Sequence, residues 1–320
     1  MSGRFSRTAG AAMAMTLGIT SVGACSDATA RTTTTATKKN LVLGFVNGGT
    51  TEFHNCLQRA VEAEAARRGV QVVSANSKQN PQAELSNMDS MIKRNVDAII
   101  VQTVNSEALG NDIARARGGG IPVLTTSVVP ADDDSILGAV VVDLNQVGLL
   151  DAGWMSNDAV GAAATTGIVA GAPGAASDVL VKGFTDNLPR NIRVVASAPG
   201  MYDRGKARAV AAQMIRQHPD LTYAFVVNED MAVGVSEAFR AAGKHVKIAT
   251  VNGTDTGLAA IRDGRFLATV ANPASKLGQQ AVENTLSLLN REPITKIDYV
   301  PISLITKPDL ERAPDYCLTE

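Results

Sequence analysis

Short runs of aliphatic and β-branched residues alternate along the chain with longer stretches whose apolar residues recur every three or four positions. The short runs are typical of buried strands, and the longer stretches are typical of helices with one apolar face. In the first part of the chain they predict strands at 41–46, 70–74, 98–102 and 122–125, and helices at 53–68, 81–94 and 106–117. The strand 98–102 has no polar residue before its last position, as in a parallel sheet covered on both faces.

The same alternation restarts after residue 165. It predicts strands at 166–170, 192–196, 223–227 and 247–251, and helices at about 175–187, 205–218 and 230–242. The chain beyond residue 40 exceeds the usual size of one domain, so we expect two lobes. The predicted fold class is α/β, with two doubly wound parallel-sheet lobes. In such sheets ligands bind beyond the carboxyl ends of the strands.

The first 25 residues follow another pattern, which predicts a lipoprotein signal peptide. Arg4 and Arg7 precede an uncharged apolar run at 9–22. That run is shorter than the roughly 20 residues needed to span a bilayer. The last four residues of the segment resemble a bacterial lipobox, in which cleavage leaves Cys25 as the lipidated N-terminus. The alternative is a buried helix of small residues with an incidental cysteine.

Residues 26–40 are rich in threonine and have almost nothing apolar to bury, so they predict a disordered tether. Together with the signal, they predict an extracytoplasmic protein, either periplasmic or lipid-anchored to the outer face of the cell membrane. Membrane contact is expected through this anchor only. The net charge of −1 leaves no basic stripe to neutralise phosphates, which argues against nucleic acid as a partner.

With Cys25 assigned to lipid, two cysteines remain, Cys56 and Cys317. Outside the cytoplasm a disulfide between them is allowed, but two buried thiols are the alternative. No spacing of cysteine and histidine suggests a metal site, because the three histidines are scattered at His54, His218 and His245. We expect no metal and no cofactor.

Enzyme signatures are absent from the sequence pattern. The segment 44–50 after the first strand lacks the spacing of a dinucleotide-binding loop, and no Gly-x-Ser-x-Gly elbow occurs. His54 has no evident nucleophile near it, and the aspartate run at 132–134 is typical of a solvated loop. The pattern therefore predicts no catalytic residue. A DNA-binding regulator with the same core would need a basic helix-turn-helix at the N-terminus, where the export signal stands.

Six ordered segments carry a resemblance to a known family. They are TEFH at 51–54, SKQNPQAEL at 77–85, GIPV at 120–123, YDR at 202–204, NEDMAVG at 228–234 and NGT at 252–254. Each one alone is weak, but their order and separations over residues 41–306 resemble the periplasmic sugar-binding proteins of the ribose and galactose type. The resemblance implies a monomeric substrate-binding protein that delivers its ligand to an ABC transporter permease. A sensor or chemoreceptor-linked binding protein without transport is the alternative.

The resemblance also implies the type I periplasmic-binding-protein fold, in which three crossover segments form a hinge between the lobes. Carried onto this chain, it puts residues 41–143 and 273–300 in the N-terminal lobe. Residues 144–272 and 301–320 would form the C-terminal lobe. The crossings would lie near Asp143, Asn272 and Pro301.

Nine positions match, or stand in place of, ligand-binding positions of that family: Thr51, Phe53, His54, Ser127, Asp143, Tyr202, Asn228, Asn252 and Asn272. A sugar presents C–H faces to aromatic rings and hydroxyls to hydrogen-bonding groups. The resemblance assigns the first role to Phe53 and Tyr202, and the second to the polar residues. Each position also has a purely structural alternative, as a packed helix residue, a helix cap or a turn residue.

Departures from the family pattern concern charge. Ser127 and Val128 stand where typical sugar binders have an Asp-Arg pair, and Asn252 stands where the other lobe has an aspartate. The family's arginine is missing from 171–183, and His54 replaces a second aromatic residue. Since a buried unpaired charge costs several kcal/mol, we expect a neutral ligand. A deoxygenated sugar, a polyol or a less hydroxylated metabolite fits this expectation.

Overall fold

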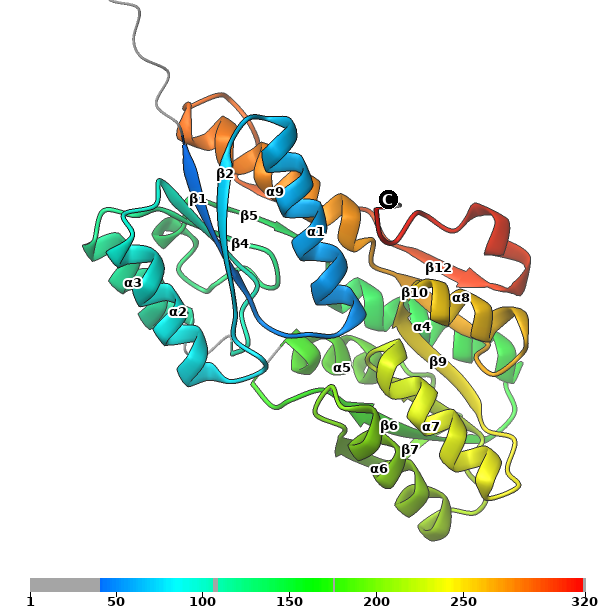
Figure 1. Ribbon diagram of the computed structural model, residues 1–320. Coiled ribbons are helices and arrows are strands. Elements are labelled where there is room, and N and C mark those ends of the chain that lie inside the picture. The colour runs from blue at the N-terminus through cyan, green and yellow to red at the C-terminus, as the bar shows by residue number, and fades with distance from the viewer. Residues whose placement is uncertain (1–40, 106–108, 175, 319–320) are drawn as a thin grey trace, which may run out of the picture. The chain divides into compact units, whose positions relative to one another are not determined.

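The computed structural model describes residues 41–105, 109–174 and 176–318, which include two six-stranded sheets (Figure 1). The predicted signal peptide and tether, including Cys25, lie outside the described residues. In the first part of the chain the elements are β1 (Val42–Asn47), α1 (Glu52–Arg67), β2 (Gln71–Asn76), α2 (Pro81–Lys93), β3 (Ala98–Val101), α3 (Leu109–Gly118), β4 (Val123–Thr125), a 3-10 turn (Asp133–Ser135), β5 (Gly138–Val141) and α4 (Leu144–Ala159).

The elements after α4 repeat the alternation of strand and helix. They are β6 (Ala164–Ala170), α5 (Ala176–Asp186), β7 (Ile192–Pro199), α6 (Arg204–Gln217), β8 (Tyr223–Val226), α7 (Glu229–Ala241), β9 (Lys247–Asn252), α8 (Asp255–Arg262), β10 (Ala268–Ala271), α9 (Ala274–Leu289), β11 (Ile297–Tyr299), β12 (Ser303–Thr306) and a 3-10 segment (Lys307–Arg312). Each predicted strand and helix that lies within the described residues is present, with most ends shifted by one or two residues and β7 continuing three residues past its predicted end.

The first sheet has the strand order β11-β5-β4-β3-β1-β2, and all its pairings are parallel. Helices α1 and α9 pack against each other on one face, and α2 and α3 lie together on the other (Figure 1). Every residue of β3 and β5 is buried. This double coverage is why these strands carry continuous apolar runs.

The second sheet has the order β12-β10-β9-β8-β6-β7, with α4 against α5 and α6 against α7. Its strands are parallel except β12, which pairs antiparallel with β10. The reason is topological. The chain leaves the first sheet at the carboxyl end of β11 and, three residues later, enters the second sheet at the edge where β10 ends. The sequence pattern did not predict β12, because its four residues, only one of which is fully buried, show no clear period.

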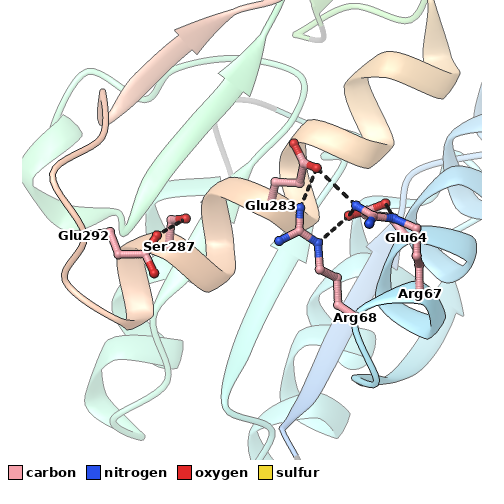
Figure 2. Close-up of polar contacts among 6 residues, drawn as sticks. All are labelled: Glu64, Arg67, Arg68, Glu283, Ser287 and Glu292. Carbon is pink, nitrogen blue, oxygen red and sulfur yellow. Dashed lines mark hydrogen bonds and ion pairs between the residues drawn. The ribbon is translucent and has the colours of Figure 1, made fainter.

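An ion-pair network holds α9 beside α1 (Figure 2). The carboxylate of Glu64, whose side chain is only 4% exposed, accepts hydrogen bonds from Arg67 Nε at 2.7 Å and Arg68 Nε at 2.6 Å. Arg68 also reaches Glu283 of α9 at 2.5 Å. Burial raises the pKa of Glu64, but the two arginines outweigh it and lower the pKa overall. Charge therefore joins two helices that are distant in sequence.

A disulfide joins Cys56 to Cys317, which are 261 positions apart in sequence. The sequence left this pairing open against two buried thiols, and the structure contains the bond. Cys56 lies one turn into α1 and is fully buried, whereas Cys317 belongs to the last described segment of the chain. In the described part of the chain, no helix is long and apolar enough to cross a membrane.

Candidate functional site

A cavity of about 100 Å³ lies where residues that follow strands of both sheets meet. This is the edge at which doubly wound sheets place their ligands. Eight of the predicted site residues line it: Thr51, Phe53, His54, Ser127, Tyr202, Asn228, Asn252 and Asn272. The described lining residues include no aspartate, glutamate, lysine or arginine. The site is therefore small and uncharged.

Asp143 is placed differently from the other eight. Its carboxylate caps α4 by accepting a hydrogen bond from the Gln146 N–H at 3.0 Å. It lines a neighbouring hollow that shares Ser127 and Leu144 with the cavity. The structural alternative, a helix cap, accounts for this contact, and a ligand role for Asp143 stays a prediction.

Five polar residues of the cavity were not predicted from the sequence: Gln79, Gln102, Thr103, Thr126 and Ser177. Four of them come shortly after strands, and that position is the signal that could have found them. Gln102 and Thr126 are already joined, because the Thr126 hydroxyl donates to Gln102 Oε1 at 2.8 Å. Through these residues the first sheet contributes primary amides and hydroxyls to the site.

The N-terminus of α1 brings a histidine into the cavity as an uncharged ring. His54 is 8% exposed, and its Nδ1 lies 2.8 Å from the hydroxyl of Thr51. Burial lowers the pKa of His54 to about 4, so the ring is neutral at pH 7. It meets Phe53 edge to face, with 5.5 Å between the ring centroids. The two rings give the first lobe an apolar surface next to one polar nitrogen.

A buried glutamate positions the loop after β3. Glu84 of α2 is inaccessible to solvent and accepts hydrogen bonds from the Thr103 hydroxyl at 2.7 Å and the Val104 N–H at 2.5 Å. The Thr103 N–H in turn donates to the Ser127 hydroxyl at 3.2 Å, which ties the loops after β3 and β4 together. Burial raises the pKa of Glu84 to about 7, against these hydrogen bonds.

Tyr202 reaches the cavity from a strained turn after β7. It adopts φ of 54°, a left-handed conformation that costs a non-glycine residue energy. Its ring lies over Gly171, where an added Cβ would stand 2.3 Å from the ring carbon Cζ. Burial raises the pKa of Tyr202 to about 12, and its hydroxyl is hydrogen-bonded to Ser177. Glycine at 171 is thus required for the ring to sit here.

Asn228 serves two roles at once. Its Oδ1 accepts a hydrogen bond from the Met231 N–H at 2.9 Å, which caps α7, and the residue also lines the cavity. Because the oxygen is committed to the cap, the amide nitrogen is the group that can donate to a ligand. The cap and the site therefore do not exclude each other.

Asn252 and Asn272 end neighbouring strands of the second sheet and are joined through the backbone, since the Asn272 N–H donates to the Asn252 carbonyl at 2.8 Å. Asn252 has φ of 136°, a region that side chains rarely adopt. Strain of this kind gathers at functional sites. The Oδ1 of Asn272 is shielded from water and has no hydrogen-bond partner in the described structure. A buried acceptor of this kind favours a donor from a ligand.

Glu229 of α7 holds the loop that follows Asn252. It is 1% exposed and accepts hydrogen bonds from the N–H groups of Gly253 and Thr254, at 2.9 and 2.8 Å, and from the Thr269 hydroxyl at 2.6 Å. Burial raises the pKa of Glu229 to about 7, against these hydrogen bonds. Its role is to position the loop, because it does not line the cavity.

The described residues contain no group of three histidine, cysteine, aspartate or glutamate side chains arranged to hold a metal ion. The cavity offers amides, hydroxyls and aromatic faces instead. Such a site can hold an uncharged polar molecule by hydrogen bonds. Two α/β lobes with a cavity of this kind define the class of two-lobed solute-binding proteins.

Residues 43–293 match the family model described as periplasmic binding protein domain, and the chain belongs to this family. It is 27% identical over 280 residues to a ribose import binding protein of Bacillus subtilis, covering 87% of this chain and 91% of that protein. It is 25% identical over 268 residues to a xylitol-binding protein of Mycolicibacterium smegmatis, covering 82% and 76%.

Solved structures of other binding proteins have the same fold. An ABC transporter solute-binding protein from Bacillus halodurans, solved with bound myo-inositol, superimposes with a TM-score of 0.80 at 22% identity, covering 85% of this chain and 96% of that one. The predicted fold class and the resemblance to ribose- and galactose-type binding proteins are confirmed. The family model and the ribose import binding protein describe binding proteins, so this chain is a binding protein rather than an enzyme.

Proposed function

We propose that this protein binds one small, uncharged molecule with several hydroxyl groups, a sugar or polyol, and delivers it to an ABC transporter permease. The observation that carries the proposal is the uncharged cavity between the two sheets. The names of the matched relatives, for ribose import and for xylitol binding, support both the ligand class and the delivery step.

The lining favours a ligand that can donate and accept. Asn272 Oδ1 is a buried acceptor without a donor, and the amide nitrogen of Asn228 can donate to a ligand. Gln102 and Thr126 are already hydrogen-bonded to each other. A hydroxyl can do both, whereas a carboxylate or ammonium would enter a cavity without a counter-charge and lose solvation energy. The cavity volume of about 100 Å³ lies well below the range of drug-sized sites, which fits a small metabolite.

Capture is proposed to work by lobe closure. Polar groups of the two lobes approach each other beside the cavity: the backbone of Glu52 in α1 lies next to the Asp230 carboxylate of α7, and the Glu52 carboxylate lies next to Thr254. A micromolar ligand provides about −8 kcal/mol. Shifting a two-state equilibrium from 1:99 to 99:1 needs about 5.5 kcal/mol. Ligand binding is therefore sufficient to drive closure.

The lobe boundaries remain part of the proposal: residues 41–143 with 273–300, and 144–272 with 301–320. Strand membership supports them, since β11 lies in the first sheet and β12 in the second. The hinge would run through the crossings near Asp143, Asn272 and Pro301.

A thermal-shift screen of neutral sugars and polyols tests the ligand class. We expect a stabiliser, and we expect Asn272→Ala to weaken its binding about tenfold without lowering the melting temperature, because the variant removes a buried unpaired oxygen. Asn111→Ala, on the exposed face of α3, is the matched control and should bind normally. Stabilisation by charged metabolites alone, or full affinity in Asn272→Ala, would remove this site assignment.

We further propose that Cys25 carries a lipid that anchors the protein outside the cytoplasm. The order of positive charge, apolar run and cysteine in the sequence supports it. Radioactive palmitate should label the wild-type protein, and Cys25→Ser should abolish the label while leaving ligand binding intact. Equal labelling of the two proteins would refute the anchor.

A further inference from the structure

The end of the chain returns from the second lobe to the first. Strand β12 pairs with β10 in the second sheet, and the 3-10 segment Lys307–Arg312 packs against α8. Beyond it, Cys317 is bonded to Cys56 in α1 of the first lobe. A segment fixed at both ends in this way connects the two lobes outside the three crossings.

Noncovalent contacts place this segment along the hinge. The Ser275 N–H donates to the carbonyl of Tyr316 at 3.0 Å, and the Ser275 hydroxyl donates to the carbonyl of Asp315 at 2.8 Å. Ser275 lies in the first turn of α9, three residues after Asn272 of the cavity. The segment also lines a hollow with Pro273 and Pro301. It therefore follows the residues about which the lobes would turn.

Tyr316 anchors the segment at the junction of the lobes. It is 4% exposed, and its hydroxyl is shielded from water without a hydrogen-bond partner in the described structure. Burial raises the pKa of Tyr316, and the carboxylates of Glu229, Glu52 and Asp230 lie close enough to add to this effect. Glu52 belongs to the first lobe and the other two to the second, so the ring is buried where the lobes meet.

The segment is short. Five residue steps separate Arg312, on the second lobe, from Cys317, which is bonded to the first. At 3.3–3.6 Å per residue, the chain between them spans about 17 Å when fully extended. Any opening that separates these two points further has to break the disulfide or detach the 3-10 segment from α8.

We propose that residues 313–317 and the Cys56–Cys317 bond form a covalent strap that limits how far the two lobes open. The proposal deepens the proposed function, because it concerns the motion by which the ligand is captured. A strap narrows the ensemble of open states, so less conformational freedom is lost when the lobes close on a ligand. The oxidising environment outside the cytoplasm would keep the Cys56–Cys317 disulfide formed.

The experiment compares the full-length chain carrying Cys25→Ser, in which Cys56 and Cys317 are the only cysteines, with the same chain carrying Cys56→Ser and Cys317→Ser as well. Both are studied without ligand by solution X-ray scattering and by amide hydrogen exchange. The reporter amide is Glu52 N–H, which lies next to Asp230 of the other lobe. We expect a larger radius of gyration without the bond and exchange of the Glu52 amide about tenfold faster.

Two controls separate the strap from a merely structural role. Ser275→Ala removes a hydrogen bond of the segment but keeps the disulfide, and it should leave both measurements unchanged. If the double-serine variant fails to fold, reduction of the Cys25→Ser protein by a phosphine provides the same comparison. Faster exchange confined to residues 313–318, with unchanged scattering, would overturn the proposal. No ligand is needed, so failure of the sugar screen does not affect this test.

Discussion

In each lobe one buried glutamate holds a loop of the cavity in place, but the loop held in the second lobe has a more strained backbone. In the first lobe, Glu84 holds the loop after β3 through one N–H and one hydroxyl. In the second, Glu229 holds the loop after β9 through two N–H groups and one hydroxyl. Burial raises the pKa of each carboxyl to about 7.

The difference lies in what each glutamate holds in place. The loop that Glu229 binds follows Asn252, whose φ of 136° is strained. Asp151 of α4 is also fully buried in the second lobe, and neither of its oxygens has a hydrogen-bond partner in the described structure. Cavity geometry in the second lobe is thus held by one carboxylate against several unfavourable features, so we expect that lobe to be the more sensitive to substitution.

The largest effect is expected from removing the glutamates. Glu229→Ala leaves three donors without their acceptor, and we expect it to lower the free energy of unfolding by about 3–5 kcal/mol. Glu84→Ala leaves two donors without their acceptor and should lower the free energy of unfolding by about 2–4 kcal/mol. Urea unfolding measures both, with exposed Glu311→Ala as the neutral control. Equal losses for the two lobes would contradict the comparison.

The pH dependence of stability provides a second test of the two glutamates. A glutamate with pKa 4.5 unfolded and about 7 folded binds more protons in the folded state between these values. Its stabilising contribution is complete below pH 4.5 and is lost as pH rises to about 7, by about 3 kcal/mol in total. Glu84→Gln and Glu229→Gln should each flatten this decline in unfolding free energy measured from pH 4.5 to 8. An unchanged slope in both variants would show that neither carboxyl is protonated on folding.

Asp151→Ala is expected to stabilise the protein. Burial raises the pKa of Asp151 well above its usual value, and the nearby carboxyl of Glu229 adds to this. Removing the unpaired carboxyl should raise the free energy of unfolding at pH 7 by about 1–3 kcal/mol. Asp186→Ala, on the exposed face of α5, should change it by less than about 0.5 kcal/mol. Destabilisation by Asp151→Ala would point to a partner for this carboxyl.

The smallest effects concern two glycines, one in each lobe. A Cβ at Gly171 would meet the Tyr202 ring at 2.3 Å, whereas a Cβ at Gly49 would meet Gln79 Nε2 at 2.4 Å and His54 Cε1 at 2.8 Å. The ring is held by a strained backbone, so Gly171→Ala should weaken binding of the best ligand from the screen about tenfold, or 1.4 kcal/mol. For Gly49→Ala the Gln79 amide can turn away by a rotamer change, and the His54 ring has to shift by only a few tenths of an ångström, so we expect a smaller loss of about threefold.

Gly153→Ala is the control for this pair, because a Cβ there meets no atom within 4 Å. Isothermal titration calorimetry should find unchanged affinity for it. A Gly49→Ala loss larger than that of Gly171→Ala would reverse the proposed difference between the lobes.

Most strands and helices up to β9 were readable from the chain pattern, whereas β5, α4 and all the elements from α8 to β12 were not. Runs such as 98–102 and 223–227 predicted buried parallel strands, because burial on both faces leaves no room for polar residues. No pattern marked α4, whose exposed face carries Leu149. Strand β12 is short, and its direction depends on how the chain passes between the sheets.

The residues of the candidate site likewise include some that the sequence predicted and some that it did not. Phe53, Tyr202 and the asparagines at strand ends were predicted because local pattern and family resemblance act at single positions. Gln102 and Thr126 were missed, since nothing in their own neighbourhood shows that two loops bring them within 2.8 Å.

Local sequence thus sufficed for the alternation of strands and helices, the family and the loss of charge at the site, because each of these is written in adjacent residues. Only the tertiary structure decided which polar groups share the cavity, that Glu84 and Glu229 hold its loops, and that Cys56 meets Cys317 across 261 residues. Contacts between residues far apart in the chain depend on how whole elements pack, and no local period encodes that packing.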